Sequence, residues 1–274
     1  MNRIEKKFAE LKDRGEAGLI PFVTAGDPDL PTTLRILESL HNAGADCIEL
    51  GVPFSDPTAD GPTIQRSSER ALKNGLALPA ILEIVKQFRK KFETPVILFG
   101  YYNPFFRYGL EKFARDAKRA GADGVLCVDL PPEESGELRQ RLDSEGLDLI
   151  FLLAPTSDEA RIDRVARLGR GFLYFVSVTG ITGARRSLDH ELRENVARIR
   201  RRSSLPIGVG FGISTPKQAA TVAEFADAAV VGSALVATIE QAQGRTAKAE
   251  RAGEFVADLK RAIRAVAKKN HQHT

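Results

Sequence analysis

Several features that mark other classes of protein are missing from this chain of 274 residues. It contains no apolar run long enough for a membrane-spanning helix, so we expect no membrane partner. Residues 1–14 are charged, with apolar residues at helical spacing, which argues against a signal peptide. The two cysteines, Cys47 and Cys127, both stand inside apolar runs. They therefore indicate small core residues of a reduced, cytoplasmic protein rather than a disulfide framework.

Histidine and lysine are absent from the places where catalysis would need them. None of the four histidines follows an apolar run: they are His41, His190, His271 and His273. We therefore expect no metal site. No lysine ends an apolar run either, which argues against a Schiff-base aldolase. The densest basic run, 198–202, has neither aromatic residues nor a binding motif beside it, so we expect no nucleic-acid partner.

Short apolar runs alternate with amphipathic helical stretches along the chain. Eight runs predict strands: 19–24, 47–50, 96–100, 124–128, 149–153, 172–176, 207–210 and 228–232. The tetrad Ala-Gly-Ala-Asp occurs at 43–46 and at 120–123, each time between a helix and a strand, where glycine suits a helix C-cap. Eight βα units in about 250 residues favour an α/β fold of the closed (β/α)8 TIM-barrel type. A doubly wound open sheet is the alternative.

No linker or change of composition divides the chain before about residue 240. We therefore expect a single barrel domain over residues 1–274. An extra N-terminal helix is expected at about 2–14, and a polar helical tail at about 240–274.

The segment 49–62, with the sequence ELGVPFSDPTADGP, begins at the end of the second predicted strand. Strand alternation turns Cys47 and Glu49 toward the barrel interior if Ile48 and Leu50 face the helices. Active sites of such barrels lie at the carboxyl ends of the strands. An inward carboxylate among apolar neighbours has a raised pKa, as a general acid or base at neutral pH requires.

Glycine-rich segments follow the last three predicted strands. They are 180–183, 210–214 and the pair Gly232 and Ser233. Glycine allows backbone N–H groups to approach an anion, and a following helix N-terminus adds a favourable dipole. We therefore expect a barrel that grips the phosphate of a small molecule and acts on it by carboxylate acid–base catalysis.

Six segments together resemble a known family. They are 21–28 (PFVTAGDP), 49–62, 100–104 (GYYNP), 129–131 (DLP), 179–183 (TGITG) and 210–214 (GFGIS). In this order they resemble the tryptophan synthase alpha subunit, over about residues 4–238. The resemblance implies a lyase that reversibly cleaves indole-3-glycerol phosphate to indole and glyceraldehyde 3-phosphate, without a cofactor of its own. It also implies that indole passes to a beta subunit carrying PLP, in a tetramer of two alpha and two beta chains.

The resemblance further implies roles for single residues. Glu49 matches the family's acid/base, and Asp60 matches a second catalytic carboxylate. The substrate-binding positions match Phe22, Phe99, Tyr101, Leu126, Tyr174, Thr182, Gly183, Phe211, Gly212, Gly232 and Ser233. The first four of these would be ordinary core residues without the resemblance. Thr182 stands in a segment, 178–189, that has the length and charge of a closing loop.

The loop after the second predicted strand is stiffened by prolines. It places an apolar side chain beside an acidic one, which suits a docking surface better than a solvated turn. We expect the beta subunit to contact Pro53, Phe54, Asp56 and Pro57.

Two other functions remain open. One is a stand-alone indole-3-glycerol-phosphate lyase that releases free indole, and the other is a non-catalytic activating subunit. Intact Glu49 and Asp60 disfavour the second. An isomerase of the histidine-pathway type would need aspartates ending the first and fifth strands, where this chain has Thr24 and Leu153.

Overall fold

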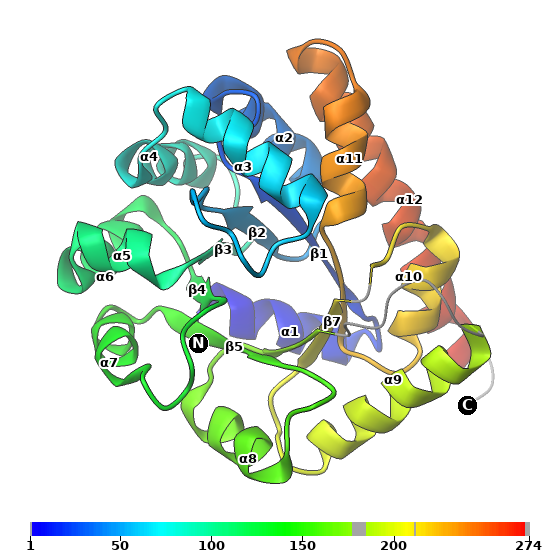
Figure 1. Cartoon of the computed structure of the whole chain (residues 1–274). Coiled ribbons are helices and arrows are strands. Elements are labelled where there is room, and N and C mark those ends of the chain that lie inside the picture. Colours follow the sequence, from blue (N-terminus) through cyan, green and yellow to red (C-terminus); the bar gives the residue numbers. More distant parts are fainter. Residues whose placement is uncertain (1, 177–184, 211, 272–274) are drawn as a thin grey trace.

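Eight parallel strands close into a barrel in the computed structural model, which describes residues 2–176, 185–210 and 212–271. Each strand pairs with the next in the chain, and β1 pairs with β8 to close the ring (Figure 1). The strands are β1 (Gly18–Thr24), β2 (Ile48–Gly51), β3 (Val96–Gly100), β4 (Gly124–Cys127), β5 (Asp148–Leu153), β6 (Leu173–Val176), β7 (Ile207–Gly210) and β8 (Ala228–Val231). Every predicted strand is found with ends that agree within one residue. The TIM barrel is therefore confirmed, and the open sheet was the wrong alternative.

Most of the helices surround the barrel on its outside, whereas the first helix of the chain lies across the end of the barrel (Figure 1). The helices have the following bounds: α1 (Arg3–Asp13), α2 (Leu30–Asn42), α3 (Pro62–Lys73), α4 (Leu78–Arg89), α5 (Tyr102–Tyr108), α6 (Leu110–Ala120), α7 (Gly136–Glu145), α8 (Glu159–Leu168), α9 (Arg185–Arg200), α10 (Pro216–Ala223), α11 (Ser233–Gln241) and α12 (Arg245–His271). None of these helices, in the part of the chain that the structure describes, is long and apolar enough to cross a membrane.

The predicted N-terminal helix is confirmed as α1. Its side chains Ile4, Phe8 and Leu11 are buried in one cluster with inward-facing strand residues such as Ile97 and Ile150. Since these helix residues recur every three or four positions, they form one apolar face. Helix α1 therefore supplies apolar side chains to the interior of the barrel.

Side chains of each strand alternate between the barrel interior and the surrounding helices. In β2 and the residue before it, Cys47 belongs to the interior cluster, whereas Ile48 and Leu50 belong to the cluster between strands and helices. The predicted orientation is confirmed. Because successive strand residues point to opposite faces, Glu49 points inward like Cys47.

The two Ala-Gly-Ala-Asp tetrads form the same turn. Gly44 and Gly121 both have φ of 92°, a left-handed value that glycine adopts without steric penalty. The aspartates that follow, Asp46 and Asp123, accept hydrogen bonds of 2.8 and 2.9 Å from the backbone N–H groups of Leu19 in β1 and Val96 in β3. These carboxylates therefore tie neighbouring strands together at the end of the barrel opposite the catalytic face.

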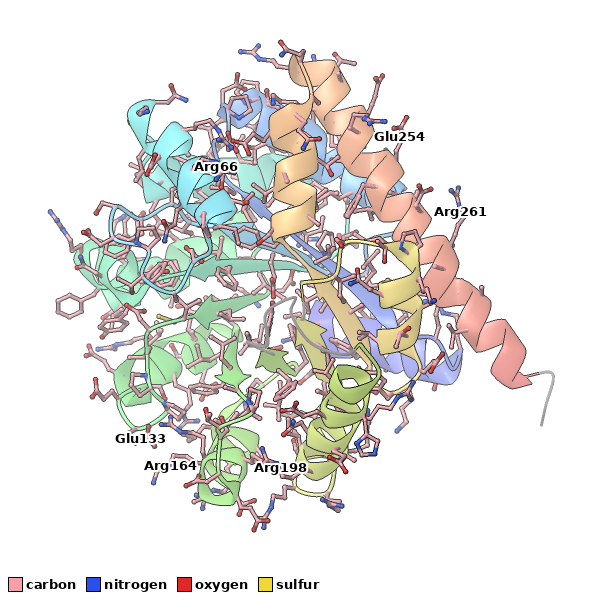
Figure 2. The ribbon with its side chains drawn as sticks, turned by 45° about the vertical axis from the view of Figure 1, so that its right-hand side comes forward. Arg66, Glu133, Arg164, Arg198, Glu254 and Arg261 are labelled. Atoms are coloured by element: carbon pink, nitrogen blue, oxygen red, sulfur yellow. The ribbon has the colours of Figure 1, made fainter. Side chains whose placement is uncertain are left out.

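Helix α12 packs more extensively than the polar tail that the sequence suggested. It lies against α2 and α10, and its buried apolar side chains are Ala249, Ala252, Val256, Leu259 and Ile263. Its outer face carries exposed residues, including Glu254 and Arg261 (Figure 2). The apolar stripe is narrow and interrupted by charged residues, which made it inconspicuous in the sequence.

A buried lysine joins α12 to the start of the barrel. Lys260 is only 2% exposed, and its Nζ lies 2.7 Å from Asp46 Oδ2 and 2.5 Å from Glu16 Oε1. Arg264 also contacts Glu16, at 3.2 Å. Burial opposes the charge of Glu16, but the hydrogen bond and charge of Lys260 prevail and lower its pKa. The ion cluster therefore connects segments that are more than 200 residues apart.

Candidate active site

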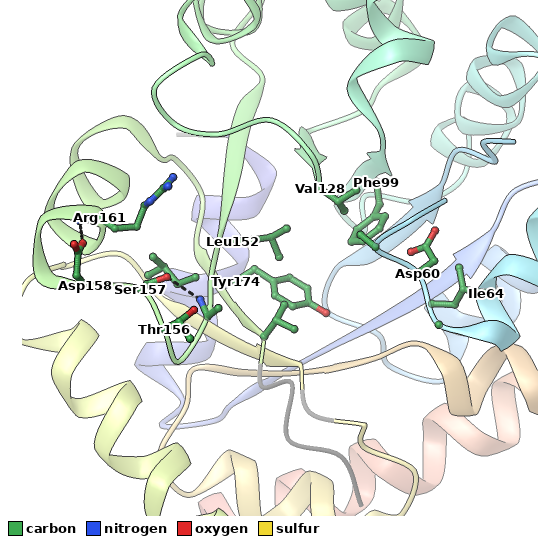
Figure 3. A pocket seen from close by; sticks show the side chains of 15 residues that line it. Asp60, Ile64, Phe99, Val128, Leu152, Thr156, Ser157, Asp158, Arg161 and Tyr174 are labelled. Carbon is green, nitrogen blue, oxygen red and sulfur yellow. Dashed lines mark hydrogen bonds between the residues drawn. The ribbon is translucent and has the colours of Figure 1, made fainter. Parts of the chain in front are cut away.

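A cavity of about 630 Å³ lies at the carboxyl ends of the strands. Of the predicted site residues, Asp60, Phe99 and Tyr174 line it (Figure 3). They come from the loop after β2, from β3 and from β6. The cavity therefore stands where barrels of this type carry their chemistry.

Glu49 lies in β2 with its carboxyl group buried. The residue is 1% exposed, and neither carboxylate oxygen has a hydrogen-bond partner among the described residues. Burial raises the pKa of Glu49 to about 8. Burial also raises the pKa of Tyr174, and the charge of Glu49 adds to that effect. At neutral pH, Glu49 is therefore mostly a neutral acid that can give a proton and take it back.

Asp60 is held at the end of the stiff loop between β2 and α3. Its backbone N–H donates to Pro57 O at 3.1 Å, and its own carbonyl accepts from Gln65 Nε2 at 2.8 Å. Burial raises the pKa of the Asp60 carboxyl, whereas a hydrogen bond from Tyr101 lowers it. The second predicted carboxylate is thus partly buried and faces the cavity.

Aromatic rings form the walls of the site. Phe22 and Phe99 meet edge to face, with centroids 5.0 Å apart and an angle of 72°. Two glycines make room for these walls. A Cβ on Gly51 would lie 2.5 Å from the Phe22 ring, and a Cβ on Gly210 would lie 2.4 Å from the Tyr174 hydroxyl. Sequence reasoning gave neither glycine this role, because the contacts are made across strand pairs.

Leu126 is fully buried in the interior cluster, opposite Phe99 in the β3–β4 register. It does not belong to the described lining of the cavity, which instead includes Ile64, Val128 and Leu152. Val128 lies two residues after Leu126 and points inward as Leu126 does. The two-residue period of the strand could therefore have indicated its position. Ile64 lies on α3, and the sequence offered no sign of its position.

The structure describes some of the residues that were predicted to bind the phosphate. Gly232 precedes α11, whose first turn has no side-chain cap, and Ser233 is the first residue of that helix. A Cβ on Gly232 would lie 3.7 Å from Phe22, so this helix N-terminus adjoins the aromatic wall. Gly212 is exposed, and a Cβ there would meet no atom within 4 Å. Three predicted residues lie outside the described residues: Thr182, Gly183 and Phe211.

The loop predicted to dock a partner has one inward and one outward side chain. Phe54 is half-buried, and its ring lies against Tyr101 with centroids 5.1 Å apart. Asp56 is exposed, Pro53 is buried and Pro57 is half-buried. The Phe54 ring therefore packs on the inner side of the loop, against Tyr101. Asp56 is the charged side chain that the loop exposes to solvent.

The arrangement suits proton transfer beside a flat apolar molecule. It combines a neutral buried acid, a second carboxylate and an aromatic slot, all near the N-terminus of α11. Among the described residues, no group of three or more histidines, cysteines and acidic residues is placed to hold a metal ion.

Comparisons with known proteins identify close relatives. A family model described as "Tryptophan synthase alpha chain" matches residues 8–264. The chain is 57% identical to the tryptophan synthase alpha chain of a Geobacter species and 58% identical to that of Citrifermentans bemidjiense, in each case over 96% of this chain and 98% of the relative. A crystal structure of tryptophan synthase subunit alpha from Legionella pneumophila str. Paris is 42% identical, has a TM-score of 0.91, and is matched over 97% of this chain and 99% of that one.

Proposed function

The chain belongs to the tryptophan synthase alpha chain family, and we propose that Glu49 and Asp60 together carry out the family's reaction in this barrel. The enzyme is a carbon–carbon lyase that cleaves indole-3-glycerol phosphate to indole and glyceraldehyde 3-phosphate. The observation that carries the assignment of residues is the buried Glu49, with a pKa of about 8, whose charge acts on Tyr174 in the lining of the cavity that Asp60 also lines.

Glu49 transfers the protons. In its neutral form it donates a proton to carbon 3 of the indole ring, which makes the ring nitrogen positively charged. The resulting carboxylate then takes the proton from the glycerol hydroxyl next to the bond that breaks. The electron pair of that bond returns to the ring, which releases neutral indole and the aldehyde. A pKa near the working pH suits both halves of this cycle.

Asp60 stabilises the charge that develops on the ring nitrogen. An ionised carboxylate that accepts a hydrogen bond from the ring N–H stabilises the cation more than the neutral substrate. The stiff loop supports this role, because Pro57 and Gln65 hold the backbone of Asp60 before substrate arrives.

The phosphate binds at the N-terminus of α11. Gly232 and Ser233 offer backbone N–H groups there, with a helix dipole that favours an anion. Gly212 lies on an open approach and contributes to the same side. Thr182, Gly183 and Phe211 complete the site in this proposal by their match to the family. Phe22, Phe99, Leu126 and Tyr174 form and support the indole slot.

Membership of the family implies a beta-subunit partner. We propose that the complex is a tetramer of two alpha and two beta chains and that the beta chain carries PLP, whereas this chain needs no cofactor. The exposed Asp56, with Pro53, Phe54 and Pro57 shaping the loop around it, forms part of the contact. A cytoplasmic location fits a biosynthetic enzyme of this kind.

The decisive experiment mixes the purified chain with indole-3-glycerol phosphate and measures indole, with and without a beta subunit. We expect slow cleavage alone and faster cleavage with the partner. Equal rates in both mixtures would favour the stand-alone lyase. No indole in either mixture, from a folded protein that binds glycerol 3-phosphate, would favour a non-catalytic subunit.

A further inference from the structure

The Tyr101 hydroxyl lies between the backbone and the carboxylate of the Asp60 loop. It accepts a hydrogen bond of 2.9 Å from the backbone N–H of Ala59. It also acts on the neighbouring Asp60 carboxyl group, whose pKa a hydrogen bond from Tyr101 lowers against the raising effect of burial. The tyrosine itself is 3% exposed at the end of β3, and the ring of Phe54 packs against it. Its hydroxyl is therefore held in one place by the barrel.

The Ala59 contact gives the second hydrogen bond a direction. Because the hydroxyl oxygen accepts the N–H of Ala59, its own proton is free to be donated to Asp60. Burial and then the charge of Asp60 raise the pKa of Tyr101 to about 12, so the hydroxyl keeps its proton at neutral pH. A donor to a carboxylate stabilises the ionised form of that carboxylate.

The charged groups nearby do not compete for this role. On α3, Arg66 and Arg70 are turned to Glu240, at 3.2 and 2.6 Å. Asp129 acts on Tyr101 as a second negative charge, and it accepts the backbone N–H of Tyr102 at 2.8 Å. Within the described part of the chain, no cation forms an ion pair with Asp60, so Tyr101 is the side chain that supports its charge.

Two further ionisable groups line the same cavity beyond Tyr174. Asp158 caps α8 by accepting the backbone N–H of Arg161 at 2.8 Å. The Arg161 side chain pairs with Glu133 at 3.0 Å, so it is turned to another carboxylate. Glu49 is neutral at the start of the reaction and adds no charge there. Among the residues that the structure describes, Tyr101 is thus the side chain that donates toward the Asp60 carboxyl group.

We propose that Tyr101 is a positioning residue for the cleavage reaction, because its hydroxyl aims Asp60 into the cavity and favours the ionised form of its carboxyl group. This goes beyond the match of Tyr101 to a substrate wall. It rests on the proposed function, since it assumes that Asp60 holds the ring N–H of the substrate.

The test compares Tyr101→Phe with Tyr102→Phe. The first change removes the hydroxyl and keeps the ring against Phe54, and water can replace the hydroxyl at Ala59, which is exposed. The fold should therefore persist. Tyr102 is the matched control, because its hydroxyl makes no hydrogen bond with the described residues. We expect Tyr101→Phe to lower kcat about ten- to a hundred-fold at neutral pH, as when a hydrogen bond to a charged group is lost. KM should change little, and Tyr102→Phe should behave like the wild type.

The pH profile separates positioning from simple packing. Without the hydroxyl the pKa of Asp60 rises further, so the acid limb of kcat should move to higher pH in Tyr101→Phe alone. Carbon-13 NMR of the Asp60 carboxyl group should report the same rise without any turnover. An unmoved Asp60 titration, or a loss of kcat that is equal at every pH, would overturn the inference.

A double variant distinguishes this failure from failure of the proposed function. If Tyr101 acts through Asp60, Tyr101→Phe should cost nothing further in an Asp60→Asn background, measured by single turnover. Losses that multiply would overturn the role of Tyr101 and leave the role of Asp60 intact. Full activity of Asp60→Asn by itself would instead overturn the proposed function.

Discussion

Replacing Glu49 with glutamine should stabilise the protein and abolish cleavage at the same time. Glutamine keeps the size of the side chain and remains polar, but it neither ionises nor transfers a proton at these pH values. The wild-type carboxyl is buried, and neither oxygen has a hydrogen-bond partner among the described residues. Turnover by Glu49→Gln should therefore be almost lost, whereas glycerol 3-phosphate should still bind.

The size of the stability change follows from the pKa of Glu49. Folding raises it from 4.5 to about 8, so the native state binds the proton more tightly than the unfolded chain does. The stability that this proton contributes is fully present below pH 4.5 and is lost as the pH rises through 8. At about 1.4 kcal/mol for each pH unit, this loss reaches about 3 kcal/mol at pH 7 and about 5 kcal/mol at pH 9. Glutamine does not titrate, so the Glu49→Gln variant does not lose this stability. The difference in the free energy of unfolding between the variant and the wild type should therefore grow as the pH rises.

Urea denaturation of both proteins at pH 5, 7 and 9 measures this difference, alongside an indole-release assay. Other titrating groups cancel in the comparison because both proteins contain them. Glu69→Gln, at an exposed glutamate of α3, is the matched control and should show no widening. A stability difference that stays constant with pH would refute the burial argument for Glu49. Retention of even a tenth of the turnover would refute its catalytic role.

Three further predictions concern the phosphate, the partner and the core. Gly232→Val should leave thermal stability unchanged but weaken glycerol 3-phosphate binding, measured by calorimetry, by about 1–3 kcal/mol, because the side chain crowds the helix N-terminus; unchanged affinity would place the phosphate elsewhere. Asp56→Ala should reduce activation by the beta subunit more than it reduces basal cleavage, and equal losses would show that the loop serves catalysis alone. Lys260→Met should lower the free energy of unfolding by about 3–5 kcal/mol, because Asp46 and Glu16 lose their buried partner; a loss below 1 kcal/mol would show that the ion cluster contributes little.

The barrel could be predicted because its periodicity is local. Each strand is a short apolar run, and each is followed by a turn or helix signal that needs no knowledge of distant residues. The same alternation predicted the inward direction of Glu49, because Cys47 and Glu49 share one face of β2. The fold and the first catalytic residue therefore followed from neighbours in the chain.

Features that depend on contacts between distant segments could not be predicted in this way. Gly210 must be small because the Tyr174 hydroxyl of the neighbouring strand lies where a Cβ would stand. The bond between Tyr101 and the Asp60 loop likewise joins residues 42 positions apart, measured at Ala59. Such pairs are set by strand register and side-chain rotamers, which a single sequence does not reveal.

The buried Lys260 has a consequence for how the chain is made. Asp46 and Glu16 emerge early from the ribosome, but their cation is supplied by a residue near the end of the chain. Strand β1 likewise cannot pair with β8 until β8 has been synthesised. Until α12 is synthesised, the N-terminal units carry carboxylates that cannot be buried without a partner, and their edge strand stays open. The barrel should therefore close only after translation is nearly complete. Chains truncated before Lys260 should be degraded by proteases and should not fold into a shorter active enzyme.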